Sequence, residues 1–280
     1  MSGALLEARG LALAYGSGAA ARAVLRAVDL SLAPGEVVSV IGPSGAGKSS
    51  VLRLLAGLQP ATHGTVRMQG ELLDAPHPRI AVAFQDACLL PWLSVAHNVG
   101  FGLDFRRQPA LGRAERHERV ARTLAAVGLG HAHHLFPAQL SGGMAQRVAL
   151  ARCLARQPLA LLLDEPFGAL DEITRADMQA LLLRIVREYG PATLLITHDI
   201  DEALLLSDRI VLLGAAPGEP AGVAREWRIA LPHPREAQVE ALGALRVEIV
   251  RALRALLRAG GTQHTEASPS AAPHPRTIAV

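Results

Sequence analysis

The chain contains 280 residues, half of them hydrophobic, and carries a formal net charge of only +3. This length can bury a large core and suits one large domain or two modest ones. The small net charge gives no support for a nucleic-acid partner, and every apolar run falls short of the ~18 residues that a membrane-spanning helix needs.

Targeting and redox features point to a soluble cytoplasmic protein. Residues 1–7 lack the basic and then apolar pattern of a signal peptide. Cys88 and Cys153 lie far apart without metal-ligand spacing, which fits unpaired thiols in a reducing compartment. Arginines cluster between residues 106 and 122, and we interpret them as a solvated helix face.

The N-terminal segment is expected to form short antiparallel strands. Residues 5–9, 11–15 and 28–32 have strand character, and a Gly/Ala-rich loop separates the second from the third. The turn Pro34-Gly35-Glu36 ends this segment. The apolar run 37–41 then predicts a buried strand.

A glycine-rich loop follows this run directly, and residues 42–49 read Gly-Pro-Ser-Gly-Ala-Gly-Lys-Ser. The strand before it and the helical pattern at 51–55 after it are typical of a phosphate-binding P-loop. Glycines let the backbone direct several N–H groups at a polyphosphate, and the helix start adds its positive end. Lys48, the only lysine of the chain, would reach the β- and γ-phosphates, and Ser49 would offer a hydroxyl to Mg²⁺.

The middle of the chain changes from strands to helices. Residues 65–68 predict an edge strand, and 80–84 predict a buried strand that ends at Gln85. From residue 91 to 157 we expect a helical insertion in an α/β core, with helices at 95–105, 114–127 and 141–155.

The α/β pattern then resumes. We expect a buried strand at 159–163, a helix at 171–189, a strand at 192–196, a helix at 201–206 and a last core strand at 209–213. The Pro/Gly-rich stretch 215–234 has some strand character at 223–229. An amphipathic helix at 237–258 is expected to cap its own domain, with a membrane-surface helix as the alternative. The tail 260–280 is expected to be disordered.

Two further motifs could complete a nucleotide site. Asp164 and Glu165 follow a buried strand, where an aspartate can hold Mg²⁺ and a glutamate can orient and polarise an attacking water. The run 140–144, Leu-Ser-Gly-Gly-Met, begins a helix whose bared N–H groups suit an anion, although alone it is only an N-cap. A second phosphate-binding helix end suggests a nucleotide shared between two subunits.

Together these motifs resemble the ATPase subunit of an ATP-binding cassette (ABC) transporter, over about residues 5–235. The resemblance implies an α/β P-loop NTPase fold of the ABC ATPase type: a mixed parallel core sheet, an N-terminal antiparallel β subdomain and an α-helical subdomain at about 91–157. Residues 236–259 would be a C-terminal amphipathic helix and 260–280 a disordered tail.

The resemblance also implies a site for ATP and Mg²⁺. The residues expected at the nucleotide are Tyr15, Gly42, Pro43, Ser44, Gly45, Ala46, Gly47, Lys48, Ser49, Ser50, Gln85, Ser141, Gly142, Gly143, Asp164 and Asp171. Ser49, Gln85 and Asp164 would contact the metal. The catalytic group would consist of Glu165, His198, Gln85 and Lys48.

The run 140–144 would be the signature segment of the family. Two copies would pack head to tail, each P-loop facing residues 141–143 of its partner. Asp171 would bridge the dimer and His198 would contact the γ-phosphate. Tyr15 would stack on adenine, with a core tyrosine as the alternative. His131, His133 and His134 have no carboxylate or cysteine partner in the sequence pattern, and we interpret them as a solvated loop.

The finer resemblance is to importers for nitrate, aliphatic sulfonates, taurine and pyrimidine vitamin precursors. The run 84–92, Phe-Gln-Asp-Ala-Cys-Leu-Leu-Pro-Trp, and the run 163–171 carry it, whereas the proline-rich stretch 217–222 departs from it. In this group Leu90, Pro91 and Trp92 would meet an integral-membrane permease, and a solute-binding protein would recognise the cargo. The chain would then lie at the cytoplasmic face of the membrane, held there by the permease.

Other classes fit the chain less well. A DNA-repair or chromosome-structure ATPase separates the P-loop from the signature by a long coiled coil, whereas only about ninety residues without sustained heptads intervene here. A translation factor of the cassette class would carry two sets of motifs. A non-enzymatic binding module would not need both Glu165 and His198.

Overall fold

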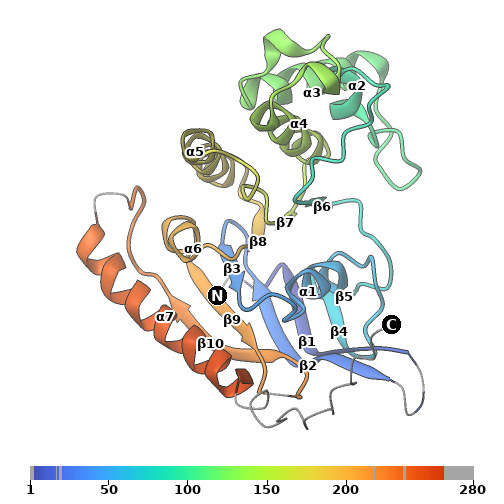
Figure 1. The fold of residues 1–280 in the computed structure, drawn as a ribbon. Coiled ribbons are helices and arrows are strands. Elements are labelled where there is room, and N and C mark those ends of the chain that lie inside the picture. The colour runs from blue at the N-terminus through green and yellow to red at the C-terminus, as the bar shows by residue number, and fades with distance from the viewer. Residues whose placement is uncertain (1–2, 17, 19–20, 217, 236–237, 262–280) are drawn as a thin grey trace, which may run out of the picture.

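The computed structural model describes residues 3–16, 18, 21–216, 218–235 and 238–261. Two sheets form the body of the molecule, and α2, α3 and α4 are grouped together beyond the end of β6 and β7 (Figure 1). This is the expected α/β architecture, with a mixed core sheet, an antiparallel sheet and a helical part.

The six-stranded core sheet has the strand order β10-β9-β3-β8-β7-β6. Its strands are β3 (Val37–Ile41), β6 (Ile80–Ala83), β7 (Ala160–Asp164), β8 (Ala192–Ile196), β9 (Arg209–Gly214) and β10 (Gly222–Arg228). All neighbouring pairs from β6 to β9 are parallel, and only β10 is antiparallel to its neighbour. The carboxyl ends of β3, β6, β7 and β8 therefore meet at one edge of the sheet.

The four-stranded antiparallel sheet has the order β2-β1-β4-β5. Its strands are β1 (Leu6–Tyr15), β2 (Arg22–Leu32), β4 (His63–Met68) and β5 (Glu71–Leu72). The expected strands 5–9 and 11–15 are one strand, β1, whose register shifts between Ala8 and Leu11 beside Gly10 at φ +56°. The expected edge position of 65–68 is wrong, because β5 pairs with the outer side of β4.

Helices connect the strands and flank them. They are α1 (Lys48–Leu55), α2 (Val95–Gly100), α3 (Arg113–Ala126), α4 (Gly142–Ala155), α5 (Glu172–Tyr189), α6 (Ile200–Leu206) and α7 (Val239–Gly261), with 3₁₀ turns at Gly130–Ala132 and Pro137–Gln139. The expected helix 95–105 is too long. It ends at Gly100 because Phe101 is extended and Gly102 has φ +90°.

The five parallel strands of the core sheet are buried on both faces, as their nearly continuous apolar sequences predict. Successive side chains of a strand point to opposite faces. On β7, Leu161 and Leu163 pack with the helices α2 to α5, whereas Ala160 and Leu162 pack with α1 and the antiparallel sheet. The helix of the P-loop is therefore enclosed between the two sheets.

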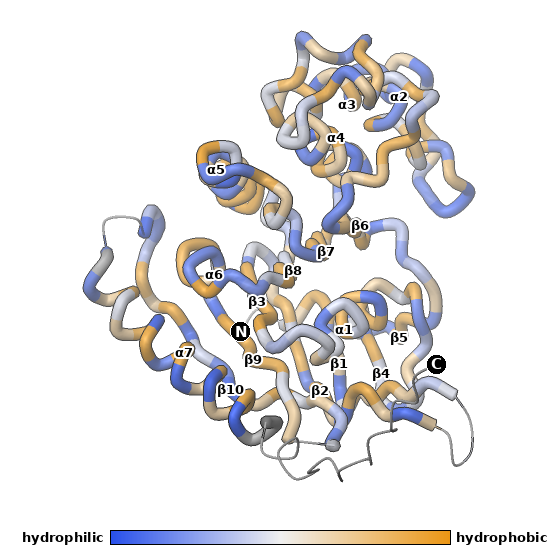
Figure 2. Tube along the Cα trace, in the orientation of Figure 1, coloured by the Kyte–Doolittle hydropathy of each residue, from blue (hydrophilic) through white to orange (hydrophobic). Residues whose placement is uncertain are grey.

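The C-terminal part adds a third apolar cluster. The strand character at 223–229 corresponds to β10, which extends the core sheet beyond β9. Along α7, hydrophilic and hydrophobic residues alternate in Figure 2, and Leu242, Leu245 and Leu256 pack on β9, β10 and α6. The helix thus caps its own domain, and the membrane-surface alternative finds no support. The expected start of the tail at residue 260 is wrong, because α7 continues through Gly261, and residues 262–280 lie outside the described residues.

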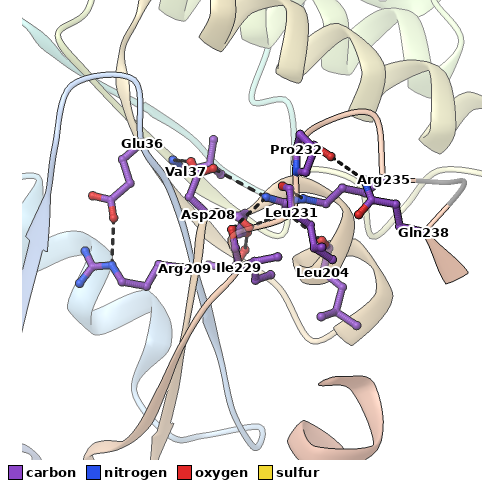
Figure 3. A network of polar contacts seen from close by, with 12 residues as sticks. Glu36, Val37, Leu204, Asp208, Arg209, Ile229, Leu231, Pro232, Arg235 and Gln238 are labelled. Carbon is purple, nitrogen blue, oxygen red and sulfur yellow. Dashed lines mark hydrogen bonds and ion pairs between the residues drawn. The ribbon is translucent and has the colours of Figure 1, made fainter. Parts of the chain in front are cut away.

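A buried arginine holds the segment before α7 against the sheet (Figure 3). Arg235 is 1% exposed, and it donates to the carbonyl oxygens of Leu231 at 2.9 Å, Leu204 at 3.0 Å and Ser207 at 2.6 Å. Its guanidinium also lies 3.8 Å from Asp208.

Asp208 extends this network to β3. Its carboxylate accepts a 2.9 Å hydrogen bond from the Val37 N–H, and the neighbouring Arg209 pairs with Glu36 at 3.0 Å (Figure 3). The strand that carries the P-loop is thereby anchored at its start.

No helix among the described residues is both long and apolar enough to cross a membrane.

Candidate functional site

The P-loop is positioned by β3, which is buried at every residue and hydrogen-bonded to β8 and β9. Gly42 ends the strand at φ +155°, and a Cβ there would lie 2.2 Å from the carbonyl oxygen of Leu213. Only glycine allows this close approach of two backbones. Gly47, at φ +84°, caps α1 in the left-handed conformation.

Lys48 lies at the first turn of α1 and is buried. Its Nζ donates to the carbonyl oxygens of Gly42 at 2.9 Å and Pro43 at 3.1 Å, so the side chain folds over its own loop. Burial lowers the pKa of Lys48, while the charges of Glu165 and Asp164 oppose that shift. The ammonium group therefore lies within the field of both carboxylates.

Ser49 and Asp164 bring together two oxygen donors from distant parts of the chain. The Ser49 hydroxyl donates to Asp164 Oδ1 at 3.2 Å. Burial raises the pKa of the Asp164 carboxyl, and the Ser49 hydrogen bond opposes the shift. A hydroxyl beside a half-buried carboxylate is the kind of oxygen donor set that Mg²⁺ accepts, with its remaining ligands from phosphate and water.

Glu165 and His198 converge from the ends of β7 and β8. The Glu165 Oε2 lies 3.2 Å from His198 Nδ1. Glu165 has φ +46°, and its N–H donates to the Ile196 carbonyl at 2.9 Å, which fixes its position. The imidazole is 66% exposed and lies beside a carboxylate that is 25% exposed. A water bound here would meet a base next to a group able to contact a phosphate.

Gln85 reaches the same place from the end of β6. A Cβ built on Gly168 would lie 3.9 Å from both Gln85 Nε2 and Glu165 Oε2, so the two side chains flank this glycine. Two residues of α4 hold the segment that follows β6. Gln146 donates to the Gln85 carbonyl at 2.6 Å, and Arg152 donates to the carbonyls of Ala87 and Cys88, each at 2.8 Å.

Tyr15 lies at the end of β1 and is 46% exposed, which excludes the alternative of a core tyrosine. Its hydroxyl accepts a 3.2 Å hydrogen bond from Gln59. Hydrogen bonds from Gln59 and Ser50 lower the pKa of Tyr15. The ring therefore stands beside the first turn of α1, next to the P-loop.

The signature segment lies elsewhere. Ser141 caps α4 by accepting from the Met144 N–H at 3.3 Å, and Asp171 caps α5 by accepting from the Thr174 N–H at 3.0 Å. A Cβ on Gly143 would lie 2.4 Å from Thr174 Cγ2, so the two helix starts are neighbours. Among the described residues, no hydrogen bond or ion pair joins 141–143 or Asp171 to the P-loop.

A buried carboxylate beside the site was not predicted from the sequence. Glu202, in the first turn of α6, is 5% exposed, and burial raises its pKa to about 7. Arg175 of α5 donates to the Leu170 carbonyl at 3.0 Å and lies 3.8 Å from Asp199. Only the position of Glu202 in the amphipathic pattern of α6 hinted at its burial.

No group of three or more His, Cys, Asp or Glu side chains in the described residues could hold a metal ion. Any Mg²⁺ at Ser49 and Asp164 would therefore depend on nucleotide oxygens for further ligands. His131, His133 and His134 are each exposed.

The family model described as "ABC transporter" matches residues 25–168, which contain the P-loop, Gln85, the signature segment and both acidic residues at the end of β7. The chain belongs to the ABC transporter family. The chain is an ABC ATPase, which binds and hydrolyses ATP.

Individual ABC proteins are similar over most of the chain. The aliphatic sulfonates import ATP-binding protein SsuB 1 of Xanthomonas axonopodis pv. citri is 49% identical over 237 residues, which cover 84% of this chain and 92% of that protein. The bicarbonate transport ATP-binding protein CmpC of Synechococcus elongatus is 47% identical over 212 residues, 76% of this chain but 32% of that protein.

A solved structure shares the fold. The dimeric ATP-binding cassette MJ0796, in a post-hydrolysis state with ADP and phosphate, has a TM-score of 0.70 and 31% identity, and the match covers 81% of this chain and all of that one.

Proposed function

We propose that this ABC ATPase energises the uptake of a small anionic or polar solute by a bacterial importer, with aliphatic sulfonates as the first candidates. The observation that carries the mechanism is the meeting of Lys48, Asp164, Glu165 and His198 at the carboxyl ends of three parallel strands. The sulfonate preference is supported by the similarity to SsuB 1 over most of both chains.

Each side chain has a role that follows from its position. Residues 42–50, with the ammonium group of Lys48 among them, would hold the phosphates, and Tyr15 would stack on adenine. Ser49, Asp164 and Gln85 would hold Mg²⁺, which screens the phosphate charge when bound. Glu165 would orient and polarise the attacking water, and His198 would contact the γ-phosphate.

One chain supplies only half of each site. Residues 141–143 and Asp171 lie at helix starts that, within the described part of the chain, make no hydrogen bond or ion pair with the P-loop, which supports their use in a partner copy. The similar cassette MJ0796 is dimeric, which supports a dimer of this chain. We infer a homodimer in which residues 141–143 of each chain close the P-loop of the other.

The chain would reach the membrane through a permease. Trp92 is 71% exposed, and Leu90 and Pro91 are next to it, so this apolar segment is the surface we assign to the permease. Gln85 precedes it on the same segment and would report nucleotide state to the membrane. We place the subunit at the cytoplasmic face and infer a separate solute-binding protein.

The division into an ATPase domain at 5–235 with a helical insertion at 91–157 is part of this proposal.

The order of candidate cargoes is aliphatic sulfonate or taurine first, then nitrate or a pyrimidine vitamin precursor. The similarity to CmpC adds bicarbonate. Alkanesulfonates, nitrate and bicarbonate are small anions, and taurine is a zwitterion that carries the same sulfonate group.

The deciding experiment reconstitutes the chain with the permease and binding protein encoded beside it, in liposomes. ATP hydrolysis is then measured with alkanesulfonates, taurine, nitrate, bicarbonate and pyrimidines in turn. We expect an alkanesulfonate or taurine to stimulate hydrolysis several-fold. The Glu165→Gln variant is the background control, because it should bind ATP and form the dimer with little turnover.

Stimulation by nitrate, bicarbonate or a pyrimidine alone would replace the sulfonate assignment. A chain that hydrolyses ATP without any response to permease or solutes would support the class alternative, an ABC ATPase outside transport.

A further inference from the structure

A cavity of about 370 Å³ lies at the opposite end of the core strands from the P-loop. Its lining includes Arg79 directly before β6, Leu159 directly before β7 and Pro191 directly before β8. These strands are parallel, so their first residues share one edge of the sheet, and Glu165 lies at the other. Six residues of extended chain from Leu159 to Glu165 span about 20 Å, which separates the cavity from the nucleotide site.

Three arginines line this cavity, and none of its lining residues is acidic. They are Arg79, together with Arg119 and Arg122 of α3. Arg119 donates to Glu115 at 2.9 Å. In the part of the chain that the structure describes, the guanidinium groups of Arg79 and Arg122 make no hydrogen bond or ion pair. The cavity therefore carries positive charge that the protein itself leaves mostly unbalanced.

Two of the donor atoms are already out of contact with solvent. The Nε atoms of Arg79 and Arg119 are buried and have no hydrogen-bond acceptor among the described residues. A buried donor without an acceptor costs free energy that a suitable acceptor would recover. The planar guanidinium group is matched best by a planar or tetrahedral oxyanion.

The arginines stand on rigid elements. The Arg79 carbonyl accepts from the N–H groups of Leu159 at 2.8 Å and Ala160 at 3.1 Å, which joins its backbone to the start of β7. The Arg119 side chain is 13% exposed, and the Arg119 carbonyl accepts from the Thr123 hydroxyl at 2.7 Å. The interpretation of residues 106–122 as a solvated helix face is thus wrong for Arg119.

The rest of the lining is largely apolar. Leu154, Leu159 and Pro191 contribute hydrocarbon surface, and Tyr189 adds an aromatic ring with a hydroxyl. The volume is within the range of about 300–1,000 Å³ that is usual for small-molecule sites. A ligand that suits this lining has a charged head and a short apolar body.

We propose that this cavity is a second ligand site, which binds a small organic anion. A sulfonate, phosphate or carboxylate head is held by Arg79, Arg119 and Arg122, and a short alkyl or aryl body packs on Leu154 and Leu159. The bound anion bridges α3 to the start of the core strands, so it stabilises the packing of the helical part on the sheet. The site is independent of which solute the importer carries.

The test uses the full chain saturated with ADP and Mg²⁺, so that the P-loop is occupied. Hexanesulfonate, hexyl phosphate, hexanoate and inorganic phosphate are titrated by calorimetry. We expect one hexyl anion per chain, with binding that weakens as salt rises. The double variant Arg79→Gln/Arg122→Gln should bind at least about tenfold more weakly, since it loses two charge-assisted contacts.

The matched control is Arg251→Gln/Arg254→Gln on the exposed face of α7, which removes the same charge and should bind normally. Hydrogen exchange of the unmodified chain gives a readout that needs no variant, and hexanesulfonate should protect α3 and the start of β6. Four results would overturn the proposal: no binding by any hexyl anion, equal binding by both double variants, protection confined to the P-loop, or inorganic phosphate binding as tightly as the hexyl anions.

Discussion

At the scale of single residues, burial shifts the pKa of three charged groups in or beside the site: Lys48, Asp164 and Glu202. Glu202 is buried at the start of α6, and burial is the largest cause of its raised pKa, with the charge of Asp199 acting in the same direction. Hydrogen bonds from Thr197 and Gln179 and the charge of Arg175 oppose the shift. One oxygen of Glu202 has no hydrogen-bond partner among the described residues.

This burial predicts a pH-dependent stability. Below pH 4.5 Glu202 is protonated in both the folded and the unfolded chain. As the pH rises to about 7, only the unfolded chain releases the proton freely, so the free energy of unfolding falls by up to about 3 kcal/mol and then levels off. Glu202→Gln should remove this component, and the variant should gain stability relative to the parent between pH 5 and 7.5.

Urea unfolding at several pH values measures the difference. Glu188→Gln, at an exposed position of α5, is the control and should leave the pH profile unchanged. Parallel pH profiles for the parent and Glu202→Gln would contradict the burial argument.

At the scale of elements, the C-terminal helix depends on polar contacts as well as on its apolar face. Arg235 bonds the carbonyls at the end of α6 and lies beside Asp208, which in turn bonds the start of β3 (Figure 3). Burial lowers the pKa of Arg235. A charge buried with this many acceptors is costly to remove, because the acceptors stay buried.

We therefore expect Arg235→Ala to lower the free energy of unfolding by about 3 kcal/mol. Arg235→Lys should recover little, since a single ammonium cannot satisfy carbonyls that the guanidinium reaches in several directions. Urea or thermal unfolding measures both variants. Arg251→Ala on the exposed face of α7 is the control, and its change should stay within about 0.5 kcal/mol. A stable Arg235→Ala variant would show that apolar packing alone holds α7.

At the scale of the whole molecule, the distribution of the motifs determines how the ATPase works. Lys48, Asp164, Glu165 and His198 meet in one chain, whereas residues 141–143 sit on the helical part beside α5. A head-to-tail dimer with two-fold symmetry would complete two equal sites.

This arrangement predicts complementation between two inactive variants. Lys48→Ala should abolish phosphate binding in its own P-loop, and Ser141→Arg should block the P-loop of its partner. Each variant alone should be inactive. An equal mixture should recover at most about a quarter of the parent activity, because half of the randomly assembled dimers are mixed and each has one intact site of two.

ATP hydrolysis by the refolded or co-expressed mixture measures this recovery. The control is a mixture of Lys48→Ala with Lys48→Ala/Ser141→Arg, which leaves no intact site and should stay inactive. No recovery in the first mixture, or activity of Ser141→Arg alone, would contradict the shared site.

Local patterns determined much of the fold and the site. The P-loop is a contiguous run whose glycines, lysine and serine act over one turn, so the sequence contains all of it. Buried strands such as 192–196 can be predicted from their apolar residues. The polar residues that follow such predicted strands are Asp164, Glu165, Gln85 and His198. Because the carboxyl ends of parallel strands meet at one edge of the sheet, the sequence alone predicts that these four residues lie close together.

Only the tertiary structure decided the contacts between distant segments. Gln146 bonds a carbonyl 61 positions away, Arg235 bonds the end of α6, and Arg79 lines the same cavity as Arg119 and Arg122. Such contacts produce no periodic pattern in the sequence, since each depends on how two distant elements pack together. The pairing of β10 with β9 and of β5 with β4 was decided in the same way, by neighbours that the local sequence does not contain.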